Sequence, residues 1–285
     1  MNVQELEELV VSNRDRDALI PPGRGTSGGL DTPSSPAIEV EMRRMELDLQ
    51  TARDIQRKLL PSEFPQYSYL EVGGVSQSCH AVGGDYFDVV KQEGNRAAFV
   101  VADVAGKGLS AALLTALLQG GLIGLSVSRE PTRLISQLNS YLWAHSDTNR
   151  YATAIVGDVG PDGVVEYVNA GHQPGLVARQ GEVREVLKSE CFPIGMFPGA
   201  DFRKSSARLD PDDTLILFSD GLSEAQNGAD EEFGMGRLRD VLAGNSHLPA
   251  QDLSAAILSS VAAFSGDAQQ TDDITLLVLR YKGEA

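Results

Sequence analysis

The chain has 285 residues, of which 42% are hydrophobic, and it carries a formal net charge of −16 with an isoelectric point near 4.6. This length and apolar fraction suffice for a sizeable core, whereas the acidic balance excludes the basic surface that a nucleic-acid-binding protein needs. No apolar run approaches the roughly 18 residues of a membrane span. The two cysteines, Cys79 and Cys191, lack metal-type spacing, so we expect a cytoplasmic protein whose thiols stay reduced.

The N-terminal part is expected to lie outside the globular domain. Residues 1–37 predict an extension that is largely disordered, because the stretch 21–37 combines Pro, Gly and Ser with almost nothing to bury, although a short helix is indicated over 3–20. Residues 38–61 then predict a regulatory or linker helix that ends at Pro61. Its apolar residues recur at alternating steps of four and three, with Gln56 at the one polar position. The seam comprises Ile38, Met42, Met45, Leu49, Ala52 and Leu59.

That heptad seam fits two arrangements equally well. It suits pairing with a second helix, as in a coiled coil, and it also suits a helix that lies against its own domain.

Residues 62–285 predict one α+β domain built from short apolar runs. Strands are expected at 97–102, 152–158, 164–169, 175–179, 182–187, 214–219 and 274–281. Helices are expected at 111–127, 132–146, 235–243 and 250–264. Because the strands cluster in hairpins instead of alternating with helices, the pattern favours antiparallel sheets over a doubly wound parallel sheet.

Acidic residues mark the ends of several predicted strands. Asp85 follows two glycines before a possible strand, Asp103 ends the strand 97–102, Asp220 follows 214–219, and Asp272 and Asp273 precede 274–281. Converging carboxylates repel one another unless a cation lies between them, and an oxygen-only ligand set selects Mg²⁺ or Mn²⁺. An aspartate beside a glycine is more often a simple turn residue, so spacing alone leaves a metal site and a set of turns both open.

Longer motifs carry more information. The chain resembles the SpoIIE/RsbU-like branch of the metal-dependent protein phosphatases (the PPM, or protein phosphatase 2C-like, family) in five segments that occur in the same order: VGGDYFD, DVAGKGLSAAL, NAGHQPGLV, FSDGLSEA and TDDITLLVL. ARDIQRKLLP also resembles the helix end that precedes this domain in relatives. The resemblance covers roughly residues 46–281 and implies a central antiparallel β-sandwich with helices on both outer faces.

The resemblance also implies a site with two Mn²⁺ or Mg²⁺ ions. Asp85 would bridge the ions, and Asp273 is a second choice to Asp272. Two ions about 3.5–4 Å apart activate a bridging water for attack on a phosphate ester, so Asp85 and Asp103 would act in catalysis through that water. The implied ligands are Asp85, Asp103, the carbonyl of Val104, Asp220 and Asp272.

Four further residues receive an interpretation. Lys107 stands where some relatives carry histidine; it is a candidate phosphate contact or a solvent-facing side chain, which leaves the general acid open, with a metal-bound water as one alternative. His172 is interpreted as structural, because a histidine in an Asn-Ala-Gly-His turn is more often a hydrogen-bonding residue than a catalytic one. His80 is interpreted as structural because the ligands that the resemblance implies nearby are all oxygen atoms. Asp88 is a candidate ligand for a weaker third ion seen in some relatives.

The predicted function is that of a protein serine/threonine phosphatase. The resemblance implies a phosphorylated STAS-domain substrate, an anti-sigma-factor antagonist in bacterial partner switching. An activator protein or a homodimer would act through helix 38–60. One alternative is a catalytically silent pseudophosphatase that binds a partner. A two-metal phosphodiesterase or nuclease is disfavoured by the acidic balance and by the order of the motifs.

Overall fold

The computed structural model describes residues 36–122, 130–145 and 150–283 of the chain. Most of the expected N-terminal extension, including the helix indicated over 3–20, lies outside these residues. Contacts divide the chain into two units, Met1–Arg43 and Arg44–Ala285, and the first is described only from residue 36 onward. The second unit contains both sheets and every candidate site residue.

Two antiparallel sheets form the centre of this unit. The first has the strand order β1-β10-β9-β6-β7 and the second has the order β2-β3-β4-β5-β8. The first sheet comprises β1 (Leu70–Gln77), β10 (Ile274–Tyr281), β9 (Thr214–Phe218), β6 (Gly175–Arg179) and β7 (Glu182–Leu187). The second comprises β2 (Asp85–Lys91), β3 (Ala97–Val104), β4 (Ala152–Val159), β5 (Val164–Ala170) and β8 (Ser205–Arg208).

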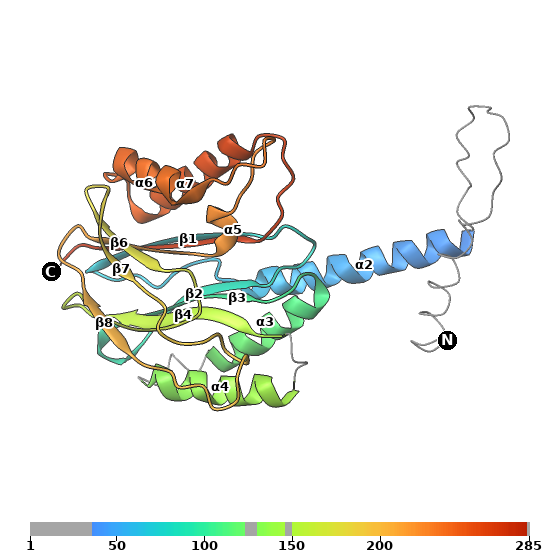
Figure 1. The fold of residues 1–285 in the computed structure, drawn as a ribbon, viewed down its shortest axis with the longest axis horizontal. Coiled ribbons are helices and arrows are strands. Elements are labelled where there is room, and N and C mark those ends of the chain that lie inside the picture. The colour runs from blue at the N-terminus through green and yellow to red at the C-terminus, as the bar shows by residue number, and fades with distance from the viewer. Residues whose placement is uncertain (1–35, 123–129, 146–149, 284–285) are drawn as a thin grey trace. The chain divides into compact units, whose positions relative to one another are not determined.

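Helices cover the outer face of each sheet, as Figure 1 shows. Helices α3 (Leu109–Leu122) and α4 (Pro131–His145) pack on the second sheet, whereas α6 (Gly234–Asn245) and α7 (Ala250–Ser265) pack on the first. The remaining elements are α2 (Pro36–Leu59), the short α5 (Asp220–Ser223) and the 3₁₀ turn η2 (Glu93–Asn95). The expected α+β sandwich with helices on both outer faces is confirmed.

Alternation along the strands explains this layering. In β3, Phe99 and Val101 enter the core between the two sheets, whereas Val100 and Ala102 face the helices. Such strands are buried on both faces and therefore read as continuous apolar runs. Helix α7 buries Leu253, Ile257 and Val261 at intervals of four residues, which places one apolar stripe on the sheet.

The predicted elements differ from the observed ones mainly at their ends. Strand β3 continues through Val104, so Asp103 lies within the strand and not after it. Helix α3 starts at Leu109, two residues earlier than expected, and the expected continuation over 123–127 lies outside the described residues. Residue 146, the expected end of the next helix, lies outside them too. Strands β1 and β8 and the short helix α5 were not predicted.

Helix α2 leaves most of its heptad seam exposed within the single chain. Met42, Met45 and Leu49 are exposed, and so are Ile38 and Leu59 at the two ends. Within the second unit, the seam residues Met45, Leu49 and Leu59 therefore stay outside the core. None of the helices in residues 36–122, 130–145 and 150–283 combines the length and the apolar character that a membrane span requires.

Candidate metal-dependent active site

Two of the predicted ligands lie opposite each other on neighbouring strands. Asp85 is the first residue of β2, and its register partner on β3 is Asp103. Side chains alternate along a strand, so both aspartates share the face of Phe87 and Val101, which line the core between the sheets. Asp85 is buried. The pair therefore lies between the two sheets, at one end of the sandwich.

The other three carboxylates come from the facing sheet. Asp220 follows β9 and begins α5, and Asp272 and Asp273 immediately precede β10, the antiparallel neighbour of β9. Since β9 ends where β10 begins, these residues meet at one edge of their sheet. The pKa of Asp103 is raised to about 7, first by burial and then by the charges of Asp220, Asp272 and Asp273. The five predicted carboxylates thus form one electrostatic group.

The pKa values of two other members are shifted in the same direction. Burial raises the pKa of Asp85 well above its ordinary value, and the charge of Asp103 adds to the effect. Burial and the charge of Asp272 raise the pKa of Asp220. A buried carboxylate among like charges favours either a proton or a cation.

A glycine loop brings the chain close to the carboxylates. Gly84 packs so tightly that a Cβ atom there would lie 2.9 Å from the Val104 carbonyl oxygen and 3.5 Å from Asp103 Oδ1. The hydroxyl of Thr115, buried in α3, donates to the Gly84 carbonyl at 2.7 Å. Only glycine permits this approach, which explains why the motif VGGDYFD has glycine directly before its first aspartate.

Asp273 holds this loop in place. One carboxylate oxygen accepts the Gly84 N–H at 2.6 Å, and the other accepts the Cys79 N–H at 2.8 Å. Asp272, by contrast, is half-exposed and keeps a carboxylate oxygen 3.1 Å from Lys107 Nζ. Asp273 therefore uses both carboxylate oxygens to hold the loop, whereas Asp272 pairs with Lys107.

Lys107 neither faces solvent freely nor lies far from the carboxylates. Its ammonium group bonds to the Thr271 carbonyl as well as pairing with Asp272. The hydrogen bond with Asp272 raises the pKa of Lys107, so the side chain is charged at neutral pH. The turn that carries it depends on Gly106 and Gly108, whose φ angles of 108° and 71° are in the region that favours glycine.

Helix α2 reaches the same loop through one side chain. The Gln56 carboxamide accepts the Gly83 N–H at 2.9 Å and donates to the Gly83 carbonyl at 2.7 Å. This residue is the one polar position in the heptad seam, and its carboxamide satisfies both backbone groups of a glycine two residues before Asp85. The sequence signalled Gln56 as an interruption of the seam but did not reveal its partner.

Two other candidates make hydrogen bonds with groups outside the five carboxylates. Asp88 shares the opposite face of β2 with Tyr86, and its carboxylate accepts the Tyr86 hydroxyl at 3.0 Å and the Val89 N–H at 2.7 Å. His172 is buried, and its Nδ1 lies 2.8 Å from the Thr153 hydroxyl. Burial lowers the pKa of His172 to about 4, so the ring is neutral and suited to a structural hydrogen bond.

The donor set fits a hard divalent cation. Asp85 Oδ2 is buried and has no hydrogen-bond partner among the described residues, and the surrounding candidate ligands are all oxygen atoms. In the part of the chain that the structure describes, no three His, Cys, Asp or Glu side chains already surround a common point as metal ligands. The strands and loops thus gather the carboxylates, while Lys107 neutralises one of them by direct contact.

The raised pKa of Asp103 predicts how the metal-free protein responds to pH. Between pH 3.8 and about 7 the folded state holds a proton on Asp103 that the unfolded state releases, so stability rises as the pH falls through 7. His172 has the opposite effect below about pH 6.5, where only the unfolded state protonates it. We expect melting temperatures in EDTA to increase from pH 8 to pH 6.5, and Asp103→Asn to reduce this increase. Identical slopes for the two proteins would contradict the prediction.

Comparison with known proteins identifies the domain. Residues 93–282 match the family described as Stage II sporulation protein E (SpoIIE). The chain is 27% identical over 272 residues to Protein IcfG of Synechocystis, an alignment that covers 85% of this chain and 43% of IcfG. It is also 27% identical over 245 residues to the phosphoserine phosphatase RsbU of Bacillus subtilis, covering 84% of this chain and 72% of RsbU.

A solved structure supports the fold independently. The SiaA-PP2C domain of Pseudomonas aeruginosa superposes with a TM-score of 0.73 at 23% identity, covering 85% of this chain and 99% of that domain. The family match extends from η2 to β10 and includes Asp103, Lys107, Asp220, Asp272 and Asp273. The chain therefore belongs to the SpoIIE family and has a PP2C-like fold.

Proposed function

We propose that the chain is a metal-dependent protein serine/threonine phosphatase that hydrolyses phosphoserine or phosphothreonine in the cytoplasm. The observation that carries this proposal is the group of five carboxylates that two facing sheets bring to one end of the sandwich. Family membership supports it, because the relative RsbU is named a phosphoserine phosphatase. The chain spans less than half of the length of IcfG. The proposal of phosphatase activity is therefore based on the candidate site of this chain.

Two Mn²⁺ or Mg²⁺ ions would be held by Asp85, Asp103, the Val104 carbonyl, Asp220 and Asp272. Bound there, the ions would supply an activated water and a clamp for the phosphate oxygens. The chain's own groups set up this chemistry: the sheet core excludes bulk water from Asp85, and Asp273 fixes the glycine loop. Because both oxygens of Asp273 already accept backbone N–H groups, we favour Asp272 over Asp273 as the ligand.

Lys107 is the candidate phosphate contact. Its ammonium group lies at the rim of the carboxylate group, charged and half-exposed, where it is able to move from Asp272 to an incoming phosphate. As a cation with three donors, it would bind phosphate oxygens as a point charge. A water molecule would donate the proton to the departing serine oxygen.

For the substrate, we propose a phosphorylated STAS-domain protein that acts as an anti-sigma-factor antagonist in partner switching. The support is the ordered set of five motifs shared with the SpoIIE/RsbU-like branch and the similarity to RsbU over most of this chain. The net charge of −16 disfavours nucleic acid as an alternative substrate.

Substrate class and metal dependence test the proposal together. We expect p-nitrophenyl phosphate and a phosphoserine peptide to be hydrolysed with Mn²⁺ and not with EDTA, whereas bis-p-nitrophenyl phosphate stays intact. Cleavage of the diester alone would indicate a phosphodiesterase instead. A folded protein that binds Mn²⁺ and releases no phosphate from any of these substrates would indicate a pseudophosphatase.

Helix α2 is the proposed route of control, either through a homodimer or through an activator protein. Its exposed seam supports helix pairing, and Gln56 connects the helix to Gly83. We expect Gln56→Ala to change kcat at saturating Mn²⁺ by about tenfold while the melting temperature shifts little, because outer contacts of this kind typically affect metal sites 10–100-fold. The matched control is Arg57→Ala, one residue along the same helix.

Equal kcat values for Gln56→Ala, Arg57→Ala and the wild type would contradict control through Gln56. Light scattering on the full chain, compared with a protein that starts at Glu63, separates the two forms of regulation. A dimer that becomes a monomer on truncation supports self-pairing, and monomers in both cases leave only the activator.

A further inference from the structure

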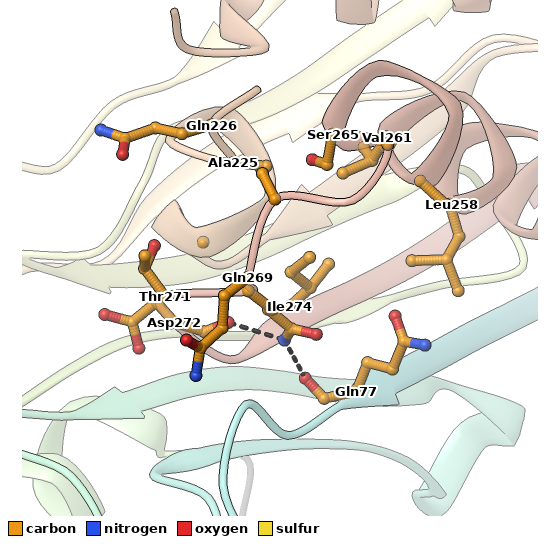
Figure 2. Close-up of a pocket in the computed structure, with 15 residues that line it drawn as sticks. Gln77, Ala225, Gln226, Leu258, Val261, Ser265, Gln269, Thr271, Asp272 and Ile274 are labelled. Atoms are coloured by element: carbon orange, nitrogen blue, oxygen red, sulfur yellow. Dashed lines mark hydrogen bonds between the residues drawn. The ribbon is translucent and has the colours of Figure 1, made fainter. Parts of the chain in front are cut away.

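A cavity of about 200 Å³ opens beside the carboxylate group, between α7, the segment after α5 and the start of β10. Figure 2 shows that Asp272 and Thr271 lie at one side of it, while Leu258 and Val261 project from the helix at the other. Gly221 and Asp272 line this cavity, and both belong to the segments that form the candidate active site. The cavity therefore adjoins the site, and Asp272 borders both.

The walls of the cavity have two distinct characters. The inner wall is apolar, and the rim carries carboxamide groups that hydrogen-bond without charge. Among the lining residues, Asp272 alone carries a charge. The apolar wall is formed by Leu258, Val261, Ile274 and Ala262, and the rim by Gln77, Gln226 and Gln269.

One hydrogen-bonded side chain fixes the wall next to the site. Gln270 Nε2 donates to the Gln77 carbonyl at 2.9 Å and to the Asp272 carbonyl at 2.7 Å, as the dashed lines in Figure 2 mark. These bonds tie the segment before β10 to the end of β1. A ligand in the cavity would thus contact a wall whose position is linked to the backbone of Asp272.

We propose that this cavity is a subsite for an aliphatic side chain of the substrate protein, at a residue that flanks the phosphoserine. This inference rests on the proposed phosphatase function. Three observations support it: the cavity shares Asp272 with the site, its inner wall is apolar, and its volume is below the 300–1,000 Å³ typical of small-molecule sites, which suits one side chain.

The charge around the cavity defines what it rejects. Asp272 is its one charged lining residue, and that carboxylate already pairs with Lys107. No lysine, arginine or histidine lines the cavity to balance an acidic side chain. An aspartate or glutamate beside the phosphoserine would lose its hydration against the apolar wall and gain no cationic partner among the lining residues, so the subsite selects against acidic flanking residues.

The test compares two neighbouring alanines of α7. Ala262 lines the cavity, whereas Ala263 does not, and both positions are exposed on the same helix. Ala262→Phe fills the cavity, and Ala263→Phe is the matched control. The substrates are phosphoserine peptides with either leucine or glutamate on both sides of the phosphoserine, together with p-nitrophenyl phosphate, which has no flanking residue.

We expect wild type and Ala263→Phe to favour the leucine peptide by about tenfold or more in kcat/KM, since a single methylene group in a hydrophobic pocket already contributes about 10–200-fold. In Ala262→Phe the two peptides should have about equal kcat/KM values, while p-nitrophenyl phosphate hydrolysis stays at the wild-type rate. Retention of the preference in Ala262→Phe would overturn the subsite. So would an equal loss with p-nitrophenyl phosphate, because that loss would mean that the cavity supports the metal site only.

Failure of the phosphatase function gives a different result. In that case wild type releases no phosphate from p-nitrophenyl phosphate with Mn²⁺, and fluorescence polarisation with the same labelled peptides decides the subsite. Tighter binding of the leucine peptide to wild type and Ala263→Phe than to Ala262→Phe would support it. Equal binding to all three would overturn it.

Discussion

Replacing Asp103 with asparagine should abolish metal-dependent turnover and leave the metal-free fold at least as stable as wild type. The carboxylate is a proposed ligand, and loss of a mere outer-sphere partner already costs 10–100-fold, so we expect kcat/KM to fall by more than about 100-fold. The same carboxylate is unfavourable in the empty fold, because burial and the charges of Asp220 and Asp272 raise its pKa to about 7. Removing that charge relieves repulsion at pH 8.

The measurement is p-nitrophenyl phosphate hydrolysis with Mn²⁺, together with thermal melting in EDTA at pH 8. Asp88→Asn is the matched control, since Asp88 lies on the same strand as Asp85 but faces the other side of the sheet. We expect the control to retain most of its activity. Equal losses in both variants, or a lower melting temperature for Asp103→Asn than for wild type, would contradict the assignment. A more stable but inactive Asp103→Asn would show that this carboxylate serves activity at a cost in the stability of the metal-free fold.

Asp273→Ala should destabilise the fold by about 2–4 kcal/mol, because it leaves the N–H groups of Gly84 and Cys79 without their acceptors. Gly84 is buried, so water cannot replace the lost oxygen there. The glycine loop would lose its anchor, and activity would fall with it. Urea unfolding in EDTA measures the free energy change without any contribution from bound metal.

Asp272→Ala is the informative comparison, because it changes a neighbouring carboxylate with a different environment. Its ion pair with Lys107 is half-exposed, and pairs of this kind contribute about 0–1 kcal/mol. We expect little change in stability but a large loss of Mn²⁺ affinity by calorimetry. If Asp273→Ala were instead the variant that stays folded and loses metal, the two roles would have to be exchanged.

The central strands were predictable from the sequence because a strand that is buried on both faces consists almost entirely of apolar residues. Residues of β3, β9 and β10 form unbroken apolar runs that only a sheet interior or a buried helix explains. Strand β1 escaped prediction because Gly73 and Gly74 interrupt its pattern. Gly73 lies where a Cβ atom would come within 2.4 Å of the Ala250 backbone. The packing of α7 on β1 therefore requires glycine at this position, and glycine interrupts the apolar pattern by which a strand is predicted.

The carboxylates of the site were predictable from their places at strand ends, and their functional meaning came from motif order. The contacts between them were not predictable. Asp273 and Asp272 are adjacent in sequence and chemically identical, and only the folded loop gives one the Gly84 N–H and the other Lys107. The partner of Gln56 lies 27 residues away in a loop with no periodic pattern. Interactions at such separations depend on the tertiary fold.

The most direct test of the central proposal is phosphate release from a phosphoserine STAS-domain protein, measured with Mn²⁺ and with EDTA. The site predicts release with Mn²⁺, none with EDTA, and loss of the phosphate from the serine confirmed by the mass of the product. Release that persists in EDTA, or that Asp103→Asn performs as fast as wild type, would contradict a phosphatase built on these carboxylates.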